Sequence, residues 1–389
     1  MKKLLFILSI AIIMIASGCS NIDEPLQKIT KDTSSAISQK ITEEEALHIA
    51  NIAVGNITTR NISNEMINTD YIISNEDKTR SNTKSDTLAY VINYPDNGGF
   101  AIIASTRNVY PILAFSHSGY FDTSQDAVSN EFTKHIEPFI QEAETSKIYE
   151  VSHKDFDACK FQLPVIGISL HQDAPWNKYV VKEHPDCPVG CVAVATATVM
   201  CYSKPEVKYH GVTYPLKEIV RAIEDAPTLE LRPLNSGIIS GTLLIYTCAQ
   251  AKDSLAKIMY WIGKDVDMIY DKDGSSATST KAFSLCCSLG YEIPSGYQDY
   301  DFDRIFNYLR QDYMIYLRGR DDEVGGHAWV SHGYRYCIDP DDPSKIINKY
   351  IYCDWGQGGA SNGYFNGNVF NALGYNFKPL KYFALKREY

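Results

Sequence analysis

The chain has 389 residues, which exceeds one ordinary hydrophobic core, so we expect at least two folded units. Hydrophobic residues make up 44% of the sequence and charged residues 22%, which excludes wholesale disorder and fibrous repeats. The net charge of −10 argues against a nucleic-acid partner and against direct binding to an anionic membrane. The ten cysteines are too sparse for a disulfide scaffold, and their pairing cannot be deduced from the sequence.

Residues 1–18 have the features of a secretion signal, because two lysines precede a short apolar run and small residues follow it. The run is too short to persist as a membrane-spanning helix. Ala16-Ser17-Gly18-Cys19 resembles a bacterial lipobox, which implies lipidation of Cys19; simple secretion with an incidental cysteine is the alternative. We therefore expect a signal peptide (1–18), a flexible tether (19–40) and an extracytoplasmic protein. Its attachment to the bacterial envelope would be through the lipid alone, with release possible after maturation.

The first folded unit is predicted at residues 41–155. Thr42 and Glu45 form a capping-box pattern that predicts a helix from 43 to about 54. Strands are predicted at Thr87–Tyr94, Gly99–Ser105 and Val109–Phe115, followed by a helix at Asn130–Lys147. The polar stretch Val151–Lys160 is expected to be a linker.

The second unit, residues 156–389, is predicted to be an α+β domain with two lobes, because helices come first and strands later. Residues 192–200 are apolar on every side, which predicts a buried helix. Further helices are predicted at 216–224, 240–262 and 280–289. Strands are predicted at Met314–Leu317, His327–Tyr334, Tyr350–Cys353 and Tyr382–Leu385.

Three residues of this unit suggest acyl-transfer chemistry. Cys191 stands at the N-terminal end of the buried helix, where free N–H groups and the helix dipole favour a thiolate. His327 begins a strand after two glycines and lies 136 positions after Cys191, a spacing compatible with papain-type enzymes. Asp354 ends a later strand, where its carboxylate is expected to orient His327, and Trp355 is expected to shield the pair from water.

Each residue taken alone has a simpler interpretation. A cysteine before a helix usually packs in a core, and a histidine in a strand is usually a structural polar residue. The order of the three motifs along the chain is nevertheless the one that a cysteine nucleophile, its base and an orienting group require.

The same motifs resemble the streptopain family of papain-like cysteine peptidases. The resemblance rests on Gln172-Asp173-Ala174-Pro175-Trp176-Asn177, Gly190-Cys191-Val192-Ala193, Gly325-Gly326-His327-Ala328-Trp329-Val330, Asp354-Trp355-Gly356, Asn362-Gly363-Tyr364-Phe365, Val266-Asp267-Met268, Gly274-Ser275-Ser276 and Gly98–Ala104. It implies a papain-like two-lobed peptidase domain preceded by a small α+β inhibitory propeptide domain.

The resemblance also implies roles for individual residues. Cys191 would be the nucleophile, His327 the general acid and base, and Gln172 a donor of the oxyanion hole together with the Cys191 N–H. Ser276 and Gly326 match positions that contact the substrate backbone, and Trp355 is grouped with them as a substrate-binding residue. The expected partners are protein or peptide substrates and the chain's own propeptide as an intramolecular inhibitor; no metal or cofactor is expected.

The chain departs from the family pattern at two positions. Asp354 replaces the usual asparagine, and Gln357 replaces a second tryptophan. A carboxylate still accepts a hydrogen bond from imidazole and stabilises imidazolium more strongly than an amide does, so we interpret Asp354 as a tuning change. The loss of the tryptophan leaves the depth of the cleft open.

The leading hypothesis is a secreted cysteine endopeptidase made as a zymogen, hydrolysing peptide bonds through a thioester. A transglutaminase-like acyl transferase would use the same chain order of residues. A catalytically silent binding lipoprotein would keep only the fold. A zinc site that includes Cys187 and Cys191 is disfavoured, because no second tight pair of thiols or histidines has matching spacing.

Overall fold

The computed structural model describes residues 38–55, 67–73, 87–124, 130–157, 159–162, 164, 166–224, 247–321, 325–371 and 380–388. The predicted signal peptide, Cys19 and most of the predicted tether lie outside these residues. So does the start of the helix predicted at 240–262.

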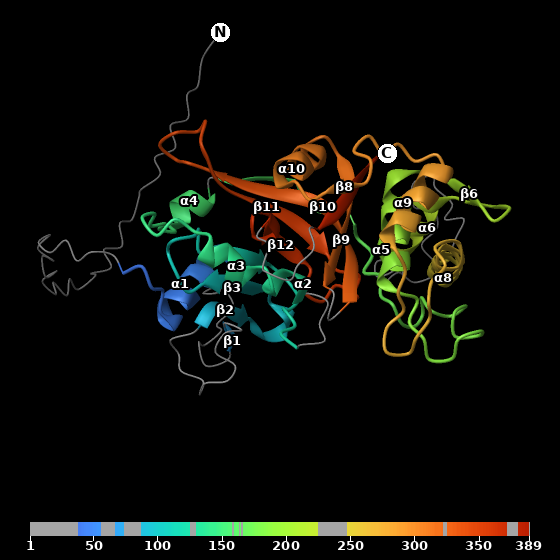
Figure 1. Ribbon diagram of the computed structural model, residues 1–389, viewed down its shortest axis with the longest axis horizontal. Helices are drawn as coiled ribbons and strands as arrows, with labels where there is room; N and C mark the ends of the chain where they lie inside the picture. The colour runs from blue at the N-terminus through green and yellow to red at the C-terminus, as the bar shows by residue number, and fades with distance from the viewer. Residues whose placement is uncertain are drawn as a thin grey trace, which may run out of the picture. The chain divides into compact units, whose positions relative to one another are not determined.

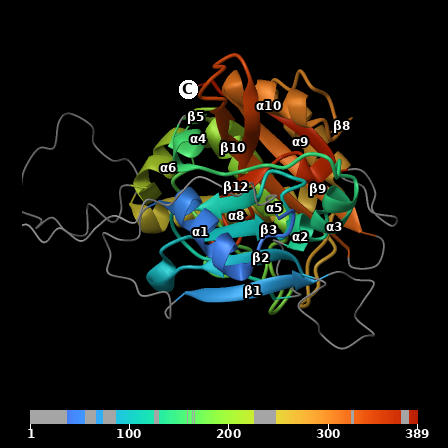
Figure 2. The same cartoon turned by 90° about the vertical axis from the view of Figure 1, so that its left-hand side faces the viewer.

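The amino-terminal region, residues 38–157, is built on an antiparallel meander covered by a helix. The helix α1 (Glu43–Val54) has the predicted capping box: Thr42 accepts from the Glu45 N–H, and the Glu45 carboxylate accepts from the Thr42 N–H. It packs on the sheet, as Figure 2 shows. The strands pair in chain order and are β1 (Asn68–Ile73), β2 (Thr87–Asn93), β3 (Phe100–Ala104) and β4 (Ile112–Ser116).

The helix predicted at Asn130–Lys147 is two short helices instead, α2 (Asn130–Thr133) and α3 (Ile136–Gln141). Pro138 explains the break, because proline has no N–H to continue the hydrogen bonds of a preceding helix but fits the first turn of a new one.

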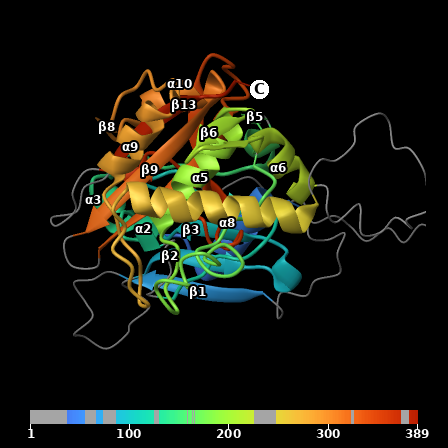
Figure 3. The same cartoon turned by 90° about the vertical axis from the view of Figure 1, so that its right-hand side faces the viewer.

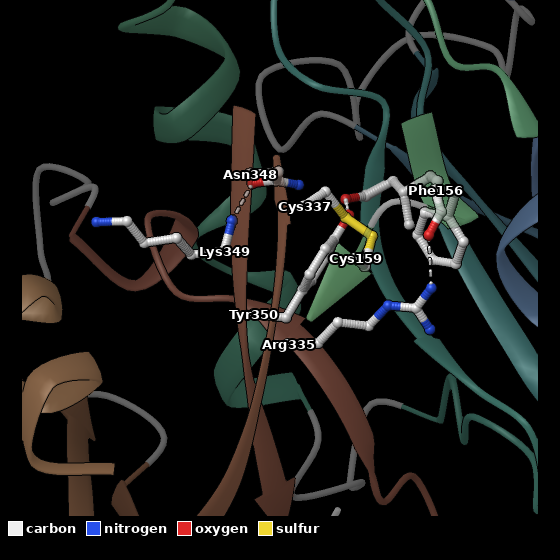
Figure 4. The surroundings of a disulfide bond; sticks show 8 residues. Phe156, Cys159, Arg335, Cys337, Asn348, Lys349 and Tyr350 are labelled. Atoms are coloured by element: carbon white, nitrogen blue, oxygen red, sulfur yellow. Dashed lines mark hydrogen bonds between the residues drawn. A yellow bond between two sulfur atoms is a disulfide. The ribbon is translucent and has the colours of Figure 1, made fainter. Parts of the chain in front are cut away.

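The stretch predicted as a linker is also structured. It contains the short helix α4 (His153–Asp157) and the strand β5 (Cys159–Gln162). A disulfide joins Cys159 to Cys337, as Figure 4 shows. Arg335 donates a hydrogen bond to the Phe156 carbonyl (3.0 Å) and lies over the Phe156 ring. The segment that follows the amino-terminal region is therefore held to β10 by a covalent bond, and the end of the region itself is held by packing.

The remainder of the chain has a helical side and a sheet side that meet at one buried helix. That helix, α5 (Cys191–Ser203), lies between the strands and the other helices (Figures 1 and 3). Its neighbours on the helical side are α6 (Leu216–Glu224), α8 (Cys248–Asp265) and α9 (Ser279–Ser288). All residues of α5 after Cys191 are buried, which agrees with the prediction of a helix apolar on every side.

The sheet side carries the long strands β9 (Tyr313–Asp321), β10 (Gly325–Ile338) and β11 (Ile346–Asp354), with β12 (Gly363–Asn366) and β13 (Lys381–Lys386) beside them. The short strand β8 (Gln298–Asp299) pairs with β13, and α10 (Phe302–Arg310) packs on β9 and β10. A separate hairpin joins β6 (Val207–Tyr209) to β7 (Val212–Tyr214). The short 3-10 turns are Pro95–Asn97 and Val369–Asn371.

One sheet runs through both parts of the chain. Its order is β1-β2-β3-β4-β12-β11-β10-β9-β13-β8, with β5 pairing β10 off this path. The junction is the antiparallel pair β4–β12, where Tyr364 is opposite Phe115 and Phe365 is opposite Ala114. Aromatic side chains from both parts also share one core, which includes Phe132, Trp355 and Phe365. The amino-terminal region thus packs against the strands that carry the predicted catalytic residues.

Candidate active site

Cys191 is the first residue of α5, as the sequence predicts. Gly190 precedes it with φ +90°, a conformation that favours glycine. A β-carbon at Gly190 would lie 2.8 Å from Met268 Sδ and 3.2 Å from the Ser275 carbonyl oxygen. Close packing by the 268–275 loop therefore fixes the backbone that delivers the thiol to the start of the helix.

The Cys191 thiol lies next to the strand that carries His327. Burial raises its pKa, whereas hydrogen bonds from the backbone N–H groups of Ala328, Val192 and Cys191 itself lower it. Ala328 adjoins His327 in β10, so the Ala328 hydrogen bond brings the thiol to the histidine's strand. In this form of the protein burial outweighs the donors, and the thiol is the favoured state.

His327 is buried and held by a backbone carbonyl. Its Nε2 lies 2.9 Å from the Trp355 carbonyl oxygen. Because a carbonyl only accepts, Nε2 carries the proton in the neutral ring, and Nδ1 is left as the basic nitrogen. Trp329 and Trp355 stack near the ring, with centroids 6.2 Å and 6.3 Å away. Burial lowers the pKa of His327 to about 4, against the raising effect of the Trp355 carbonyl.

The structure corrects the expected contact between Asp354 and His327. No hydrogen bond joins the two side chains among the described residues; Asp354 Oδ1 instead accepts from the Gly356 N–H at 3.0 Å. Strand alternation explains this, because Cys353 belongs to the core that contains Trp329, and the next side chain must face the other side of β11. Burial raises the pKa of the Asp354 carboxyl, while donors from Gly356 and Asn362 lower it.

Behind this part of β11 lies a polar cavity of about 130 Å³. Its lining includes Asp354, His332, Tyr352, Asn362 and Ser118, the last from the amino-terminal region. Burial lowers the pKa of His332 to about 3, so this ring is neutral beside the carboxyl. The cavity has the size and polarity to hold ordered water.

The other predicted site residues lie around the same helix end. Gln172 is half-buried. Its backbone carbonyl accepts a hydrogen bond of 2.8 Å from the N–H of Val189, which lies two residues before Cys191. Ser276 is exposed and forms an isolated bridge with Ile269 on the loop that packs on Gly190. Gly326 is exposed beside His327. Trp355, in contrast, is fully buried against Trp329, so it does not present a surface to substrate in this form.

Two residues of the amino-terminal region reach the site, and sequence reasoning did not identify them. Glu131 is buried and forms an ion pair with Lys134 at 2.8 Å. Its carboxylate lies against Gly319, the residue paired with His327 across β9 and β10. The Glu131 charge raises the pKa of Cys191, and the Lys134 charge lowers the pKa of His327. Both effects oppose a thiolate–imidazolium pair.

Asn362 lies in the motif Asn362-Gly363-Tyr364-Phe365, from which the sequence alone predicts no role for it in the site. Its Oδ1 accepts from the Trp355 N–H at 3.0 Å, and its amide donates to Asp354.

Among the described residues, no group of three or more His, Cys, Asp or Glu side chains is suited to a metal ion. Nor does any helix in those ranges have the length and apolar character needed to cross a membrane.

A cysteine at the start of a buried helix, packed against an antiparallel sheet that carries a histidine, defines a papain-like cysteine peptidase. Residues 170–365 match the model of the Peptidase C10 family, and residues 38–141 match that of the Spi protease inhibitor. The chain belongs to the Peptidase C10 family: it is a cysteine peptidase whose own chain carries an inhibitor domain, as in a zymogen. The resemblance to the streptopain family, the α+β fold and the zymogen peptidase hypothesis are confirmed.

The fold is also similar to that of a solved structure, a fragment of prointerpain A from Prevotella intermedia. The sequences are 21% identical, the TM-score is 0.52, and the match covers 82% of this chain and 98% of the other. No curated protein matches the chain.

Proposed function

We propose that Cys191 and His327 are the catalytic pair of a secreted endopeptidase that the amino-terminal region holds inactive. The observation that carries the proposal is the thiol at the first residue of α5, a helix that packs against β10, the strand that carries His327. The Cys191 thiolate attacks the peptide carbonyl, and imidazolium protonates the leaving amine. Water then gives a proton to neutral His327 and attacks the thioester, which releases the acid and restores the thiolate–imidazolium pair.

The developing oxyanion needs donors that are already in place. The Cys191 N–H at the helix start and the side-chain amide of Gln172 are the donors we assign to it. The backbone bond between Gln172 and Val189 supports this role, because it holds Gln172 close in sequence and space to the helix start. One such donor typically contributes about 100- to 1,000-fold to kcat. Ser276 and Gly326 flank the same end of α5 and are proposed to contact the substrate backbone.

Inhibition is proposed to act on the ionisation of the pair as well as on access to it. Glu131 places negative charge near the thiol, and Lys134 places positive charge near the imidazole, each disfavouring the charged form that catalysis needs. Removing the amino-terminal region would remove both charges.

The test uses the chain from residue 20 onward and its Cys191→Ala variant under mild reductant, with an exposed-cysteine variant, Cys287→Ala, as the control. The unaltered protein and the control should shorten to a mature form and cleave casein, while Cys191→Ala should do neither. Equal cleavage by Cys191→Ala would refute the assignment of the nucleophile. Isopeptide product from an added amine, without peptide cleavage, would instead indicate acyl transfer.

The proposed location is extracytoplasmic, with lipid on Cys19 as the only attachment to the membrane. The leader pattern of residues 1–19 supports this. Expression of the full chain in a bacterium fed a labelled fatty acid tests it: the wild-type protein should carry label and partition into detergent, and Cys19→Ala should not. Label-free wild-type protein in the medium would indicate simple secretion.

A further inference from the structure

The peptide group between Trp355 and Gly356 lies between two buried ionisable side chains. At its carbonyl end, the Trp355 oxygen accepts from His327 Nε2 at 2.9 Å. At its amide end, the Gly356 N–H donates to Asp354 Oδ1 at 3.0 Å. The carboxyl and the imidazole do not bond to each other, but both bond to the same rigid, planar unit.

The charges at the two ends of this series of hydrogen bonds match the dipole of the peptide group between them. A peptide group has its negative end at oxygen and its positive end at N–H. A carboxylate at the N–H end and an imidazolium at the oxygen end are therefore both aligned with the peptide dipole. Hydrogen bonds in such a series polarise one another, and burial of all three groups limits screening by water.

We propose that Asp354 is a positioning residue that acts on His327 through the Trp355–Gly356 peptide group, fixing the ring and stabilising its protonated form. The proposal rests on the proposed catalytic roles of Cys191 and His327. It gives a function to the carboxylate that stands where the streptopain pattern has asparagine, because an amide would keep the hydrogen bond and lose the charge.

Asn362 completes the support of this peptide unit. Its Oδ1 holds the Trp355 N–H, and its amide donates to Asp354. The N–H groups on both sides of the Trp355 carbonyl are thus fixed by side chains, so the oxygen offered to His327 has little freedom to turn. Donors from Gly356 and Asn362 lower the pKa of the Asp354 carboxyl against the raising effect of its burial.

The other described titratable groups near Asp354 and His327 do not cancel the charge of the Asp354 carboxylate. In the polar cavity, Asp354 faces the neutral His332 ring of β10 and the Tyr352 hydroxyl of β11. Among the described residues, the charge that acts on His327 is that of Lys134 and the charge that acts on Cys191 is that of Glu131; both belong to the amino-terminal region and would leave with it on maturation. Cys191 is the partner whose thiolate the imidazolium stabilises.

The experiment compares wild type, Asp354→Asn and a matched control, Asp267→Asn, in which an exposed acid that pairs with Lys281 is neutralised. Each full chain is matured by a trace of tagged wild-type enzyme, which is then removed. The pH dependence of kcat/KM on a chromogenic peptide and the pH dependence of Cys191 alkylation by iodoacetamide are recorded. Circular dichroism checks the fold.

For Asp354→Asn we expect the alkaline limb of kcat/KM, which reports loss of the imidazolium proton, to move down by about one pH unit. The alkylation profile should show a smaller thiolate population at low pH, with KM little changed. The control should overlay wild type. A folded Asp354→Asn enzyme whose kcat falls while both profiles keep their wild-type midpoints has lost only structural support, and this result would overturn the proposal. A wild-type enzyme that neither cleaves nor alkylates at Cys191 would refute the catalytic pair itself.

Discussion

The carboxylate of Glu131 lies directly against Gly319, so closely that a β-carbon at Gly319 would overlap it. Gly319 pairs with His327 across β9 and β10, and the absence of a side chain there lets an acid from the amino-terminal region reach the catalytic strands. In the proposed mode of inhibition, this close fit between one buried carboxylate and one glycine brings the Glu131 charge to the site.

Neutralising this carboxylate should weaken inhibition. In Glu131→Gln the repulsion of the Cys191 thiolate is removed, and Lys134 loses its ion-pair partner in a largely buried setting. We expect the uncleaved chain to alkylate faster at Cys191 near neutral pH and to mature sooner. Glu144→Gln, which removes an exposed ion pair with Lys147, is the matched control. Indistinguishable alkylation of the two variants would contradict the electrostatic part of the proposal.

Gly190 should tolerate no side chain. In Gly190→Ala, contact with Met268 and Ser275 must displace the start of α5, and a shift of about 1 Å at a reacting atom can cost about 100-fold in rate. Gly211→Ala is the matched control, since Gly211 also has positive φ but no heavy atom near its β-carbon position. We expect kcat/KM to collapse only in Gly190→Ala, while both variants lose some stability in urea. Full activity of Gly190→Ala would show that the helix start is less constrained than its packing indicates.

The local patterns predicted much of this architecture. The capping box at Thr42 and Glu45, the helix at 216–224 and the apolar helix after Cys191 each formed as expected, because their determinants lie within one turn or one face. The helix predicted through Pro138 did not, since the proline breaks it into two.

Other features depend on residues far apart in sequence, so no local pattern indicated them. The stretch around Cys159 is polar enough to suggest a linker, yet Cys337 and Arg335 hold it in place. The sequence predicts that Asp354 lies near His327, but it does not predict that Asp354 bonds to the Gly356 N–H and not to the imidazole. The orientation of Asp354 depends on the alternation of β11 and on the turn that follows. No sequence pattern indicated Glu131, because its place beside Gly319 depends on the fit between two regions.

The disulfide should be the main covalent source of stability in the uncleaved chain. It closes a loop between residues 178 positions apart, for which chain entropy sets a contribution of at most about 5 kcal/mol. Cys159→Ser should lower the urea midpoint of unfolding and abolish its sensitivity to reductant. Cys248→Ser, at a free half-buried cysteine, should do neither. A reductant effect that persists in Cys159→Ser would point to a different pairing in solution.

Acid should destabilise the folded protein through its buried histidines. Burial lowers the pKa of His332 to about 3, below its value of 6.5 in the unfolded chain. Between these values the unfolded state binds the extra proton, so stability is complete above pH 6.5 and falls as the pH drops. By pH 4 His332 alone should cost about 3 kcal/mol. The loss in urea midpoint from pH 7 to pH 4 should shrink in His332→Gln but not in the exposed control His153→Gln; equal losses would count against this assignment.

The β4–β12 pair has a consequence for the solubility of the mature enzyme. While β4 is present, the backbone groups of β12 are covered; if the amino-terminal region is cut away as proposed, Tyr364 and Phe365 would lie on a bare strand edge. Such edges recruit other extended chains and promote aggregation unless they are short or interrupted. Here β12 spans only Gly363–Asn366, a length that limits this hazard. Release of the amino-terminal region would therefore exchange a covered sheet edge for a bare but short one.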